Sequence, residues 1–282
     1  MHNLIFYIKY FLKYAQKIKK NYEKCINFKN LPIISSMKKS VFWKFLIYFI
    51  IYSIIGFILE TVYGIFTKGM LESRQSFLYG PFCIVYGIAA IVMIIVLTKY
   101  KDNTKKLFFY GIFVGCLVEY LASYIGELMF HVKWWDYSND FLNINGRTCL
   151  YYAILWGILS IILIRYFNPA LDKAINFVIE KVSNLLLKLA ISVVTLFMAI
   201  DGLITCYALD VFLVRVANEY NININGIDKE EVSNLYFAEA FSDEKMMMTY
   251  PNILVVNDKD EIIPLATVLS DIKNYYYKFG DK

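Results

Sequence analysis

The chain has 282 residues, of which 59% are hydrophobic, and it includes 24 tyrosines and 22 phenylalanines. Its mean hydropathy is +0.48. A soluble domain of this length is far less apolar, so the composition predicts a protein of the lipid bilayer. The net charge is only +5. In this membrane setting the basic segments do not indicate a nucleic-acid partner.

Five apolar stretches are long enough to cross about 30 Å of hydrocarbon at about 1.5 Å per helical residue. Lipid offers no water to satisfy backbone amides, so each stretch is predicted to be a helix. The fourth stretch is the shortest. The stretches are roughly residues 45–66, 80–98, 107–130, 148–164 and 189–209. The expected fold is therefore an all-α polytopic bundle of about five crossings.

Cysteine and histidine do not indicate a metal site or a disulfide framework. The cysteines are odd in number, are scattered along the chain and show no C-x-x-C spacing, so packing is their simplest role. The two histidines are too few for a histidine-built metal centre. We therefore expect neither a metal nor a cofactor. The residues concerned are Cys25, Cys83, Cys116, Cys149, Cys206, His2 and His131.

The distribution of lysine and arginine predicts the orientation of the chain. Segment 1–44 holds ten of them, whereas the short loops 67–79 and 131–147 hold two each. Segments 99–106 and 165–188, with four each, are also rich. Basic segments stay in the cytoplasm, so the N-terminus is predicted to be cytoplasmic. Five crossings then put the tail outside.

These features divide the chain into three expected parts. Residues 1–44 form a basic amphipathic segment suited to the anionic inner leaflet, and residues 45–216 form the transmembrane domain. Residues 217–282 form a polar tail with twelve acidic and six basic residues. In this tail, "NILVVNDKDEIIPLA" predicts a short hairpin with a turn near Asn257 and Asp258.

An amphipathic helix is expected between the fourth and fifth crossings. Asn168 would cap its start and Pro169 would take the first helical position. Apolar residues then recur at helical spacing up to Val182. The helix would either rest on the membrane or dock a partner protein.

Four acidic residues fall inside predicted crossings, namely Glu60, Glu119, Glu127 and Asp201. An acid at the centre of a bilayer costs about 2.5–3.5 kcal/mol on the insertion scale, so it should face the bundle interior and find a partner. Glu127 lies near the outer end of its crossing and could simply reach water. Each of the four is a candidate functional residue.

A weak internal repeat connects two of these acids. "GFILETVYG" contains Gly56 and Glu60, and "GCLVEYLASY" contains Gly115 and Glu119. A spacing of four places each glycine and its glutamate on one helix face, where the missing side chain permits close approach of a neighbour. Each element is followed by an outer loop, an arginine and a tyrosine-rich returning helix. We therefore expect two parallel repeats of a helical hairpin.

The central hypothesis is that Glu60 and Glu119 converge beneath an outer vestibule. The arginines of the two loops and the aromatic cluster "WWDYS" would form its rim. An interfacial aromatic belt is the alternative explanation of Trp134, Trp135 and Tyr137. The candidate residues of a solute or ion pathway are Glu60, Arg74, Glu119, Glu127, Trp135, Asp136, Arg147 and Asp201.

Three elements together resemble one family of bacterial polytopic membrane proteins. They are "GFILETVYG", "SFLYGPFCIVYG" and "WWDYSNDFLNINGRTCLYYAILWG". They are similar to ABC transporter permeases of the CmpB, or type IV, family over roughly residues 45–215. One departure is "CIVYG", where the family pattern has Pro-Ile-Tyr-Gly after the cysteine. The resemblance implies a plasma-membrane subunit of an ABC-type transporter that moves a small solute.

The chain contains no G-x-x-x-x-G-K-S/T phosphate-binding loop. A permease subunit of this kind would need a separate ATP-binding subunit as its partner. The other expected partners are the lipid bilayer and, optionally, a second copy of the chain.

Three other functions stay open at this point. The chain could be an ion- or proton-coupled carrier that acts alone, because membrane acids are suited to relays and cation sites. It could be a membrane-embedded enzyme acting on a lipid-linked substrate, although no catalytic constellation is recognisable. The acids and arginines could also form interhelical pairs that only hold the bundle together.

Overall fold

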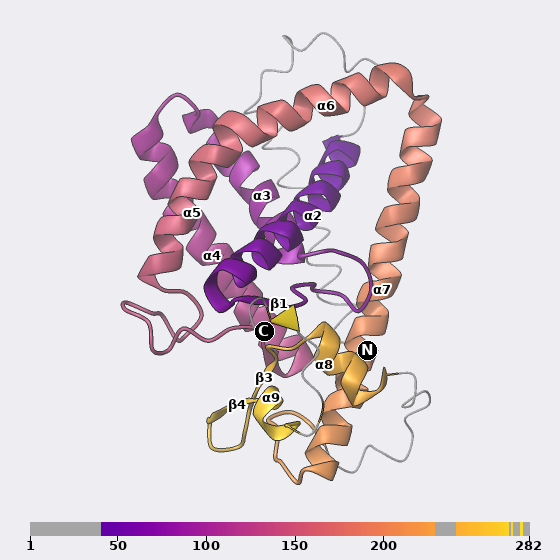
Figure 1. Ribbon diagram of the computed structural model, residues 1–282. Coiled ribbons are helices and arrows are strands. Elements are labelled where there is room, and N and C mark those ends of the chain that lie inside the picture. The colour runs from indigo at the N-terminus through magenta and orange to yellow at the C-terminus, as the bar shows by residue number, and fades with distance from the viewer. Residues whose placement is uncertain (1–40, 229–240, 271, 273–276, 279–282) are drawn as a thin grey trace.

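The computed structural model describes residues 41–228, 241–270, 272 and 277–278. In this part of the chain long helices dominate and strands are short (Figure 1). The basic amphipathic helix expected near the N-terminus falls within residues 1–40, outside the described residues.

Four helical stretches are long and apolar enough to cross a membrane: α2 (Val41–Lys68), α4 (Thr104–Phe130), Leu150–Lys181 and α7 (Asn184–Glu219). A shorter apolar helix, α3 (Ile84–Leu97), is extended by the single 3-10 turn η2 (Thr98–Tyr100). The all-α polytopic fold is confirmed. The shortest helix is, however, the second and not the fourth, because residues 80–83 remain in the preceding loop.

The third long stretch is one continuous helix with a π-helical turn in it. It consists of α5 (Leu150–Ile162), η3 (Leu163–Phe167) and α6 (Asn168–Lys181). The prediction that Asn168 caps a new helix is wrong, because this residue already has helical dihedral angles (φ −65°, ψ −42°). Pro169 has no N–H to bond one turn back, and the wide π turn before it accommodates this loss. α6 then runs across one end of the bundle to α7 (Figure 1).

The helices form two antiparallel hairpins, α2 with α3 and α4 with α5. α3 also packs against α4, which joins the hairpins into one bundle. The shared core is made by buried apolar and aromatic side chains, including Tyr48, Ala89, Met93, Leu97, Leu107, Val114 and Trp156. Large apolar side chains such as Phe109 and Phe113 point outward, as expected for surfaces in contact with lipid.

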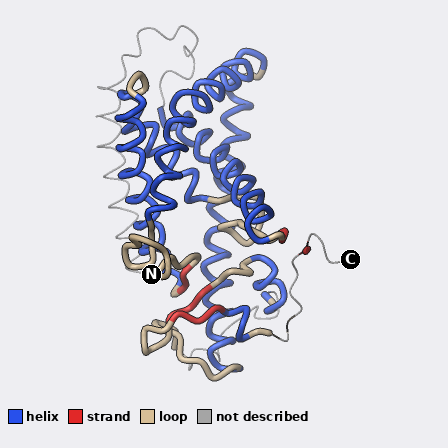
Figure 2. The backbone as a smooth tube through the Cα atoms, turned by 60° about the vertical axis from the view of Figure 1, so that its left-hand side comes forward, coloured by secondary structure: helices blue, strands red, loops and turns tan. Residues whose placement is uncertain are grey.

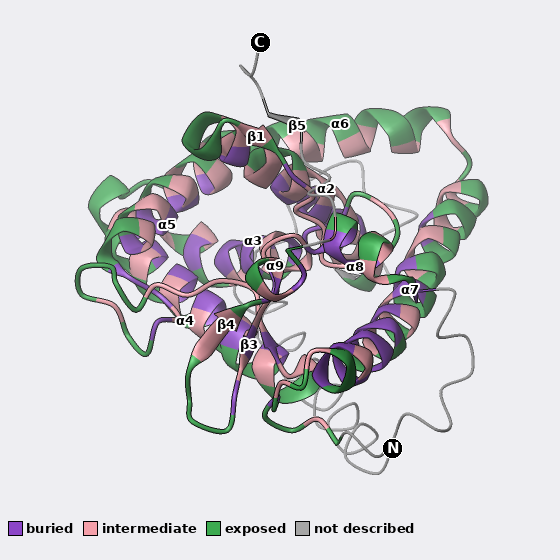
Figure 3. Cartoon of the chain, turned by 60° about the horizontal axis from the view of Figure 1, so that its bottom comes forward, coloured by how far each residue is buried: buried purple, intermediate pink, exposed green. Residues whose placement is uncertain are grey.

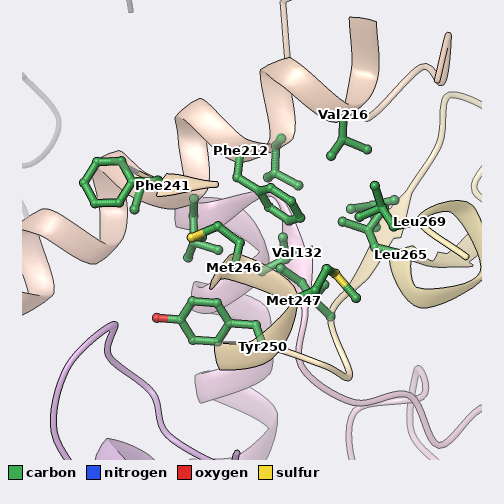
Figure 4. Packing of buried hydrophobic residues seen from close by; sticks show 14 of the residues in the cluster. Val132, Phe212, Val216, Phe241, Met246, Met247, Tyr250, Leu265 and Leu269 are labelled. Atoms are coloured by element: carbon green, nitrogen blue, oxygen red, sulfur yellow. The ribbon is translucent and has the colours of Figure 1, made fainter. Parts of the chain in front are cut away.

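α7 differs between its two halves. Near its start Leu185 and Val193 are exposed, whereas Leu209, Phe212 and Val216 near its end are completely buried. Figure 3 shows this concentration of burial along the part of α7 nearest the tail. The tail is what covers it: helices α8 (Asp243–Thr249) and α9 (Leu265–Val268) contribute to a second core with α7 (Figure 4).

The tail contains the predicted hairpin. Strands β3 (Leu254–Val256) and β4 (Ile262–Pro264) are antiparallel, and the Asn257 and Glu261 backbones bond across their turn. β3 also pairs with β2 (Val132–Lys133) from the loop of the second helical hairpin (Figure 2). β1 (Met70–Leu71), in the loop of the first helical hairpin, pairs with β5 (Tyr277–Lys278). The tail is therefore attached to the loops that join the two helices of each hairpin.

Truncation of Phe212 tests whether the tail depends on the second core. Phe212→Ala should destabilise the tail by about 3–5 kcal/mol, because the ring is fully buried between α7 and the tail. Thermal unfolding and protease cleavage within residues 241–270 of the detergent-purified protein measure this effect. The control is Leu203→Ala on the same helix, where the side chain is 64% exposed. Equal behaviour of the two variants would contradict the assignment of this core.

Candidate functional site

Glu60 lies in α2, one helical turn beyond Gly56. A Cβ on Gly56 would overlap with the first atoms of the Tyr86 side chain, so only glycine lets α3 approach this closely. The Tyr86 hydroxyl donates a hydrogen bond of 2.6 Å to Glu60 Oε1. Gly56 thus leaves the space in which Tyr86 can approach and form a hydrogen bond with Glu60.

Glu119 occupies the corresponding place in the second hairpin. It lies one turn beyond Gly115 in α4, where a Cβ would overlap with the Trp156 side chain of α5. The Glu119 side chain is only 5% exposed. The hydroxyl of Tyr137, from the loop between α4 and α5, donates to Glu119 Oε1 over 3.4 Å.

The contacts of two further glycines establish that the hairpins are repeats in structure as well as in sequence. Gly87 of α3 packs against Phe49 and Ser53, which precede Gly56 by two turns and one turn. Gly157 of α5 packs against residues 108 and 112, which precede Gly115 by the same intervals. Tyr86 and Trp156 directly precede these glycines and are therefore equivalent positions.

Glu60 and Glu119 both influence the Tyr137 phenol electrostatically. Burial raises the pKa of the Tyr137 phenol well above its ordinary value, and the charges of Glu119 and, more weakly, Glu60 raise it further. Both carboxylates are thus within electrostatic range of one phenol, which stays protonated and able to donate. We call the two glutamates together with the aromatic residues around them the acidic centre. It consists of Glu60, Glu119, Tyr63, Tyr86, Tyr137, Tyr152 and Trp156.

Ring contacts connect the members of the acidic centre. Tyr137 stacks on Tyr152 with ring centroids 4.5 Å apart, and Tyr86 lies 5.7 Å from Trp156. The hydroxyls of Tyr63 and Tyr152 are 3.5 Å apart. The acidic centre therefore draws its members from α2, α3, α4, α5 and the loop between α4 and α5.

One oxygen of the acidic centre and one beside it lack hydrogen-bond partners among the described residues. They are Glu119 Oε2 and Thr148 Oγ1. Both residues are at least nine-tenths buried. Buried polar atoms of native proteins nearly always have a partner. The Thr148 and Trp156 side chains interact with the Glu119 carboxylate but leave its Oε2 able to accept a further hydrogen bond.

The two predicted arginines also occupy equivalent places, but each is engaged by its own carboxylate. Arg74 lies over Gly64, one turn beyond Glu60, and its guanidinium is 3.0 Å from Glu72. Arg147 bonds to Ser123, one turn beyond Glu119, and pairs with Glu127 at 2.5 Å. Glu127 therefore pairs with an arginine.

The loop between α4 and α5 is folded back on itself. The Trp135 indole donates to the Arg147 carbonyl over 3.0 Å, and the Tyr137 N–H donates to the Gly146 carbonyl over 2.7 Å. Gly146 has φ +66°, and a Cβ there would overlap with the carboxylate of Asp136. Trp135 and Asp136 thus help to shape the loop that carries Tyr137 inward.

Asp201 is completely buried in α7 but lies at a different place from the acidic centre. Its two carboxylate oxygens accept the Tyr79 N–H, each at 3.2 Å, and Thr205 accepts the Leu78 N–H at 2.8 Å. Residues 74–83 therefore pass beside the middle of α7. Irregular backbone at membrane depth is stable only where protein satisfies its polar groups, and Asp201 supplies this for the loop.

Sequence reasoning missed two important groups. Glu72 lies outside every predicted crossing, yet its Oε2 accepts from Lys68, Arg74 and Asn252 and so connects the first hairpin to the tail. Its spacing of four from Lys68 was the available signal. Tyr86 was also missed as the partner of Glu60, because helical spacing within α2 contains no information about α3.

Enlarging the two helix-contact glycines should separate the hairpins. Gly56→Ala and Gly115→Ala should each destabilise the protein by about 1–3 kcal/mol, because the added methyl overlaps with Tyr86 or Trp156. Thermal unfolding in detergent measures the loss. Gly202→Ala serves as the control, since there the nearest atom is a Phe77 ring carbon at 3.3 Å. Wild-type stability of both test variants would refute the close hairpin contacts.

Removal of the Asp201 carboxylate should release the loop that it holds. Asp201→Ala should increase maleimide labelling of the buried Cys83 by about tenfold or more, because two backbone-binding oxygens are lost. The measurement needs a background in which the other cysteines are serine. Asp210→Asn, exposed on the same helix, should label as slowly as the parent. Slow labelling of Asp201→Ala would show that the loop is held by other contacts.

Comparison with known proteins identifies a family. Residues 47–206 match the family model described as "Putative ABC-transporter type IV". This segment is more than half of the chain and contains both hairpins, both glutamates of the acidic centre and Asp201. Neither the search of curated proteins nor that of solved structures gave a match. As the sequence resemblance predicted, the chain belongs to the CmpB, or type IV, family of ABC-transporter membrane proteins.

Proposed function

We propose that the chain is the permease subunit of an ABC-type transporter and that its solute passes between the two hairpins, past the acidic centre. The observation that carries the proposal is the pair of equivalent carboxylates, Glu60 and Glu119, which meet one set of aromatic groups. Binding sites of transporters commonly lie between structural repeats near the middle of the membrane. The buried, partly unsatisfied Glu119 fits this position.

Contacts at one end of the bundle support a cytoplasmic N-terminus, and the family assignment suggests a bacterial plasma membrane. Lys44, at the start of α2, pairs with Asp172 of α6 at 2.9 Å, and Arg165 donates to the Lys101 carbonyl over 2.8 Å. The lysine- and arginine-rich segments thus meet at one end, as the positive-inside rule requires of a cytoplasmic face. The tail, joined to β1 and β2, then lies at the outer end.

A separate ATP-binding subunit is part of this proposal, because the chain has no phosphate-binding loop of its own. Among the described residues, those of α6 form the surface best suited to contact the ATP-binding subunit. This helix lies at the cytoplasmic end in the proposed orientation and exposes Phe177 and Val178. The basic N-terminal segment is the other expected contact.

A carrier that acts without ATP is the second candidate function. It is favoured by the lack of a basic partner for Glu60 and Glu119 among the described residues, since uncompensated membrane carboxylates suit cation or proton coupling. An enzyme acting on a lipid phosphate is less well supported, because Arg74 and Arg147 are already paired with Glu72 and Glu127.

Transport assays with neutral variants test the proposal. Glu60→Gln and Glu119→Gln should insert and fold normally but lose about a hundredfold or more of ATP-dependent uptake, because each removes a charge from the proposed path. Uptake into proteoliposomes, with and without the copurified ATPase, measures this. Asp210→Asn should transport normally. Uptake without any ATPase would instead support the carrier, and loss of folded protein would support a purely structural role.

A further inference from the structure

The charge of the acidic centre is not balanced by the protein. Among the described residues, no lysine, arginine or histidine forms an ion pair with Glu60 or Glu119. The two arginines proposed from the sequence are paired with other carboxylates. Arg74 and Arg147 lie one helical turn beyond the glutamates of the acidic centre, where they pair with Glu72 and Glu127. The acidic centre therefore disfavours anions and favours a positively charged ligand.

A second observation points to a ligand independently of charge. Glu119 is more than nine-tenths buried, and its Oε2 has no hydrogen-bond partner among the described residues. Its other oxygen accepts from Tyr137. A cation that donates hydrogen bonds or offers a positive surface to Oε2 would satisfy this atom, which water reaches poorly.

The groups around the carboxylates are mainly aromatic. Five rings from four elements contact the carboxylates or one another: Tyr63 of α2, Tyr86 of α3, Tyr137 of the loop, and Tyr152 and Trp156 of α5. Aromatic rings attract organic ammonium ions through their negative faces, and tryptophan and tyrosine do so best. The carboxylates and phenols also offer the hard oxygen ligands that an alkali cation prefers. The ring faces, however, suit an organic cation, whose alkyl groups they can contact.

We propose that the acidic centre binds an organic ammonium cation, and thus that the solute of this transporter carries an alkylammonium group. The proposal rests on the proposed function for its link to transport. In it, Glu60 and Glu119 supply opposite charge, and the aromatic rings enclose the alkyl groups. The phenols of Tyr86 and Tyr137 hold the carboxylates in position through their hydrogen bonds.

The acidic centre is not sealed within the protein. Glu60, Tyr63 and Tyr152 are all only partly buried, and they lie where α2 and α5 approach one another through the Tyr63 and Tyr152 hydroxyls. Glu119 lies deeper. A cation entering on this side would therefore meet Glu60 first and Glu119 second.

Direct binding to the purified full-length protein tests the inference without a transport assay. Radiolabelled choline and ethylammonium are the probes, measured by equilibrium dialysis in detergent. Wild type and Asp210→Asn should bind both. Glu60→Gln and Glu119→Gln should bind about tenfold or more weakly, since each loses one charged partner of the ammonium group. The neutral isostere of choline, with carbon in place of nitrogen, should not compete.

Thermal unfolding in the absence of probe verifies that each variant is folded. Conservative Glu119→Asp should retain measurable binding, which a merely structural role of the charge would not require. The inference is overturned by the absence of binding of both probes, by unchanged binding in folded Glu119→Gln, or by displacement with sodium chloride but not with potassium chloride at equal ionic strength. The last result would indicate a sodium site.

The binding experiment and the uptake experiment can fail independently of one another. If uptake of another solute requires Glu60 and Glu119 while neither probe binds, the permease assignment stands and the ammonium inference fails. If the probes bind as expected but no ATPase supports uptake, the binding site stands and the permease assignment fails.

Discussion

Carboxyl groups and irregular backbone must find their partners inside the protein when water is absent, and this constraint organises the structure. Each acid predicted within a crossing has a specific partner from another element. Tyr86 donates to Glu60, Tyr137 to Glu119, Arg147 to Glu127 and the Tyr79 backbone to Asp201. Because these partners lie on different helices and loops, satisfying the acids also fixes how the elements pack.

Small residues make these contacts geometrically accessible. Gly56 and Gly115 give Tyr86 and Trp156 space beside a neighbouring helix, one turn from each glutamate. The two hairpins share this arrangement but differ in the side chains that complete it. Tyr86 bonds directly to its glutamate, whereas in the second hairpin the loop between α4 and α5 supplies Tyr137 instead. The two carboxylates consequently differ, because one oxygen of Glu119 has no hydrogen-bond partner among the described residues.

The tail and α7 stabilise the loop between α2 and α3. Asp201 and Thr205 bind the loop backbone from α7, while Lys245 of α8 donates to the Tyr79 hydroxyl over 3.0 Å. Glu72 adds a polar connection from the same hairpin to Asn252 of the tail. A movement of α7 would therefore shift the loop that leads into α3, because α7 side chains bind the backbone of this loop. This connects the end of the chain with the helix that carries Tyr86.

The sequence by itself determined the membrane helices, the repeat of Gly-x-x-x-Glu hairpins, the four membrane acids and the tail hairpin, because hydropathy and helical spacing are local properties. It did not determine that α3 starts late or that Asn168 lies within a continuous helix, since a satisfied loop and a π turn depend on neighbouring elements. The partners of Glu60 and Glu119, and the neutralisation of both arginines by Glu72 and Glu127, were decided only by the tertiary structure. Periodicity shows which side of a helix a residue occupies, whereas the group that meets it there comes from a distant part of the chain.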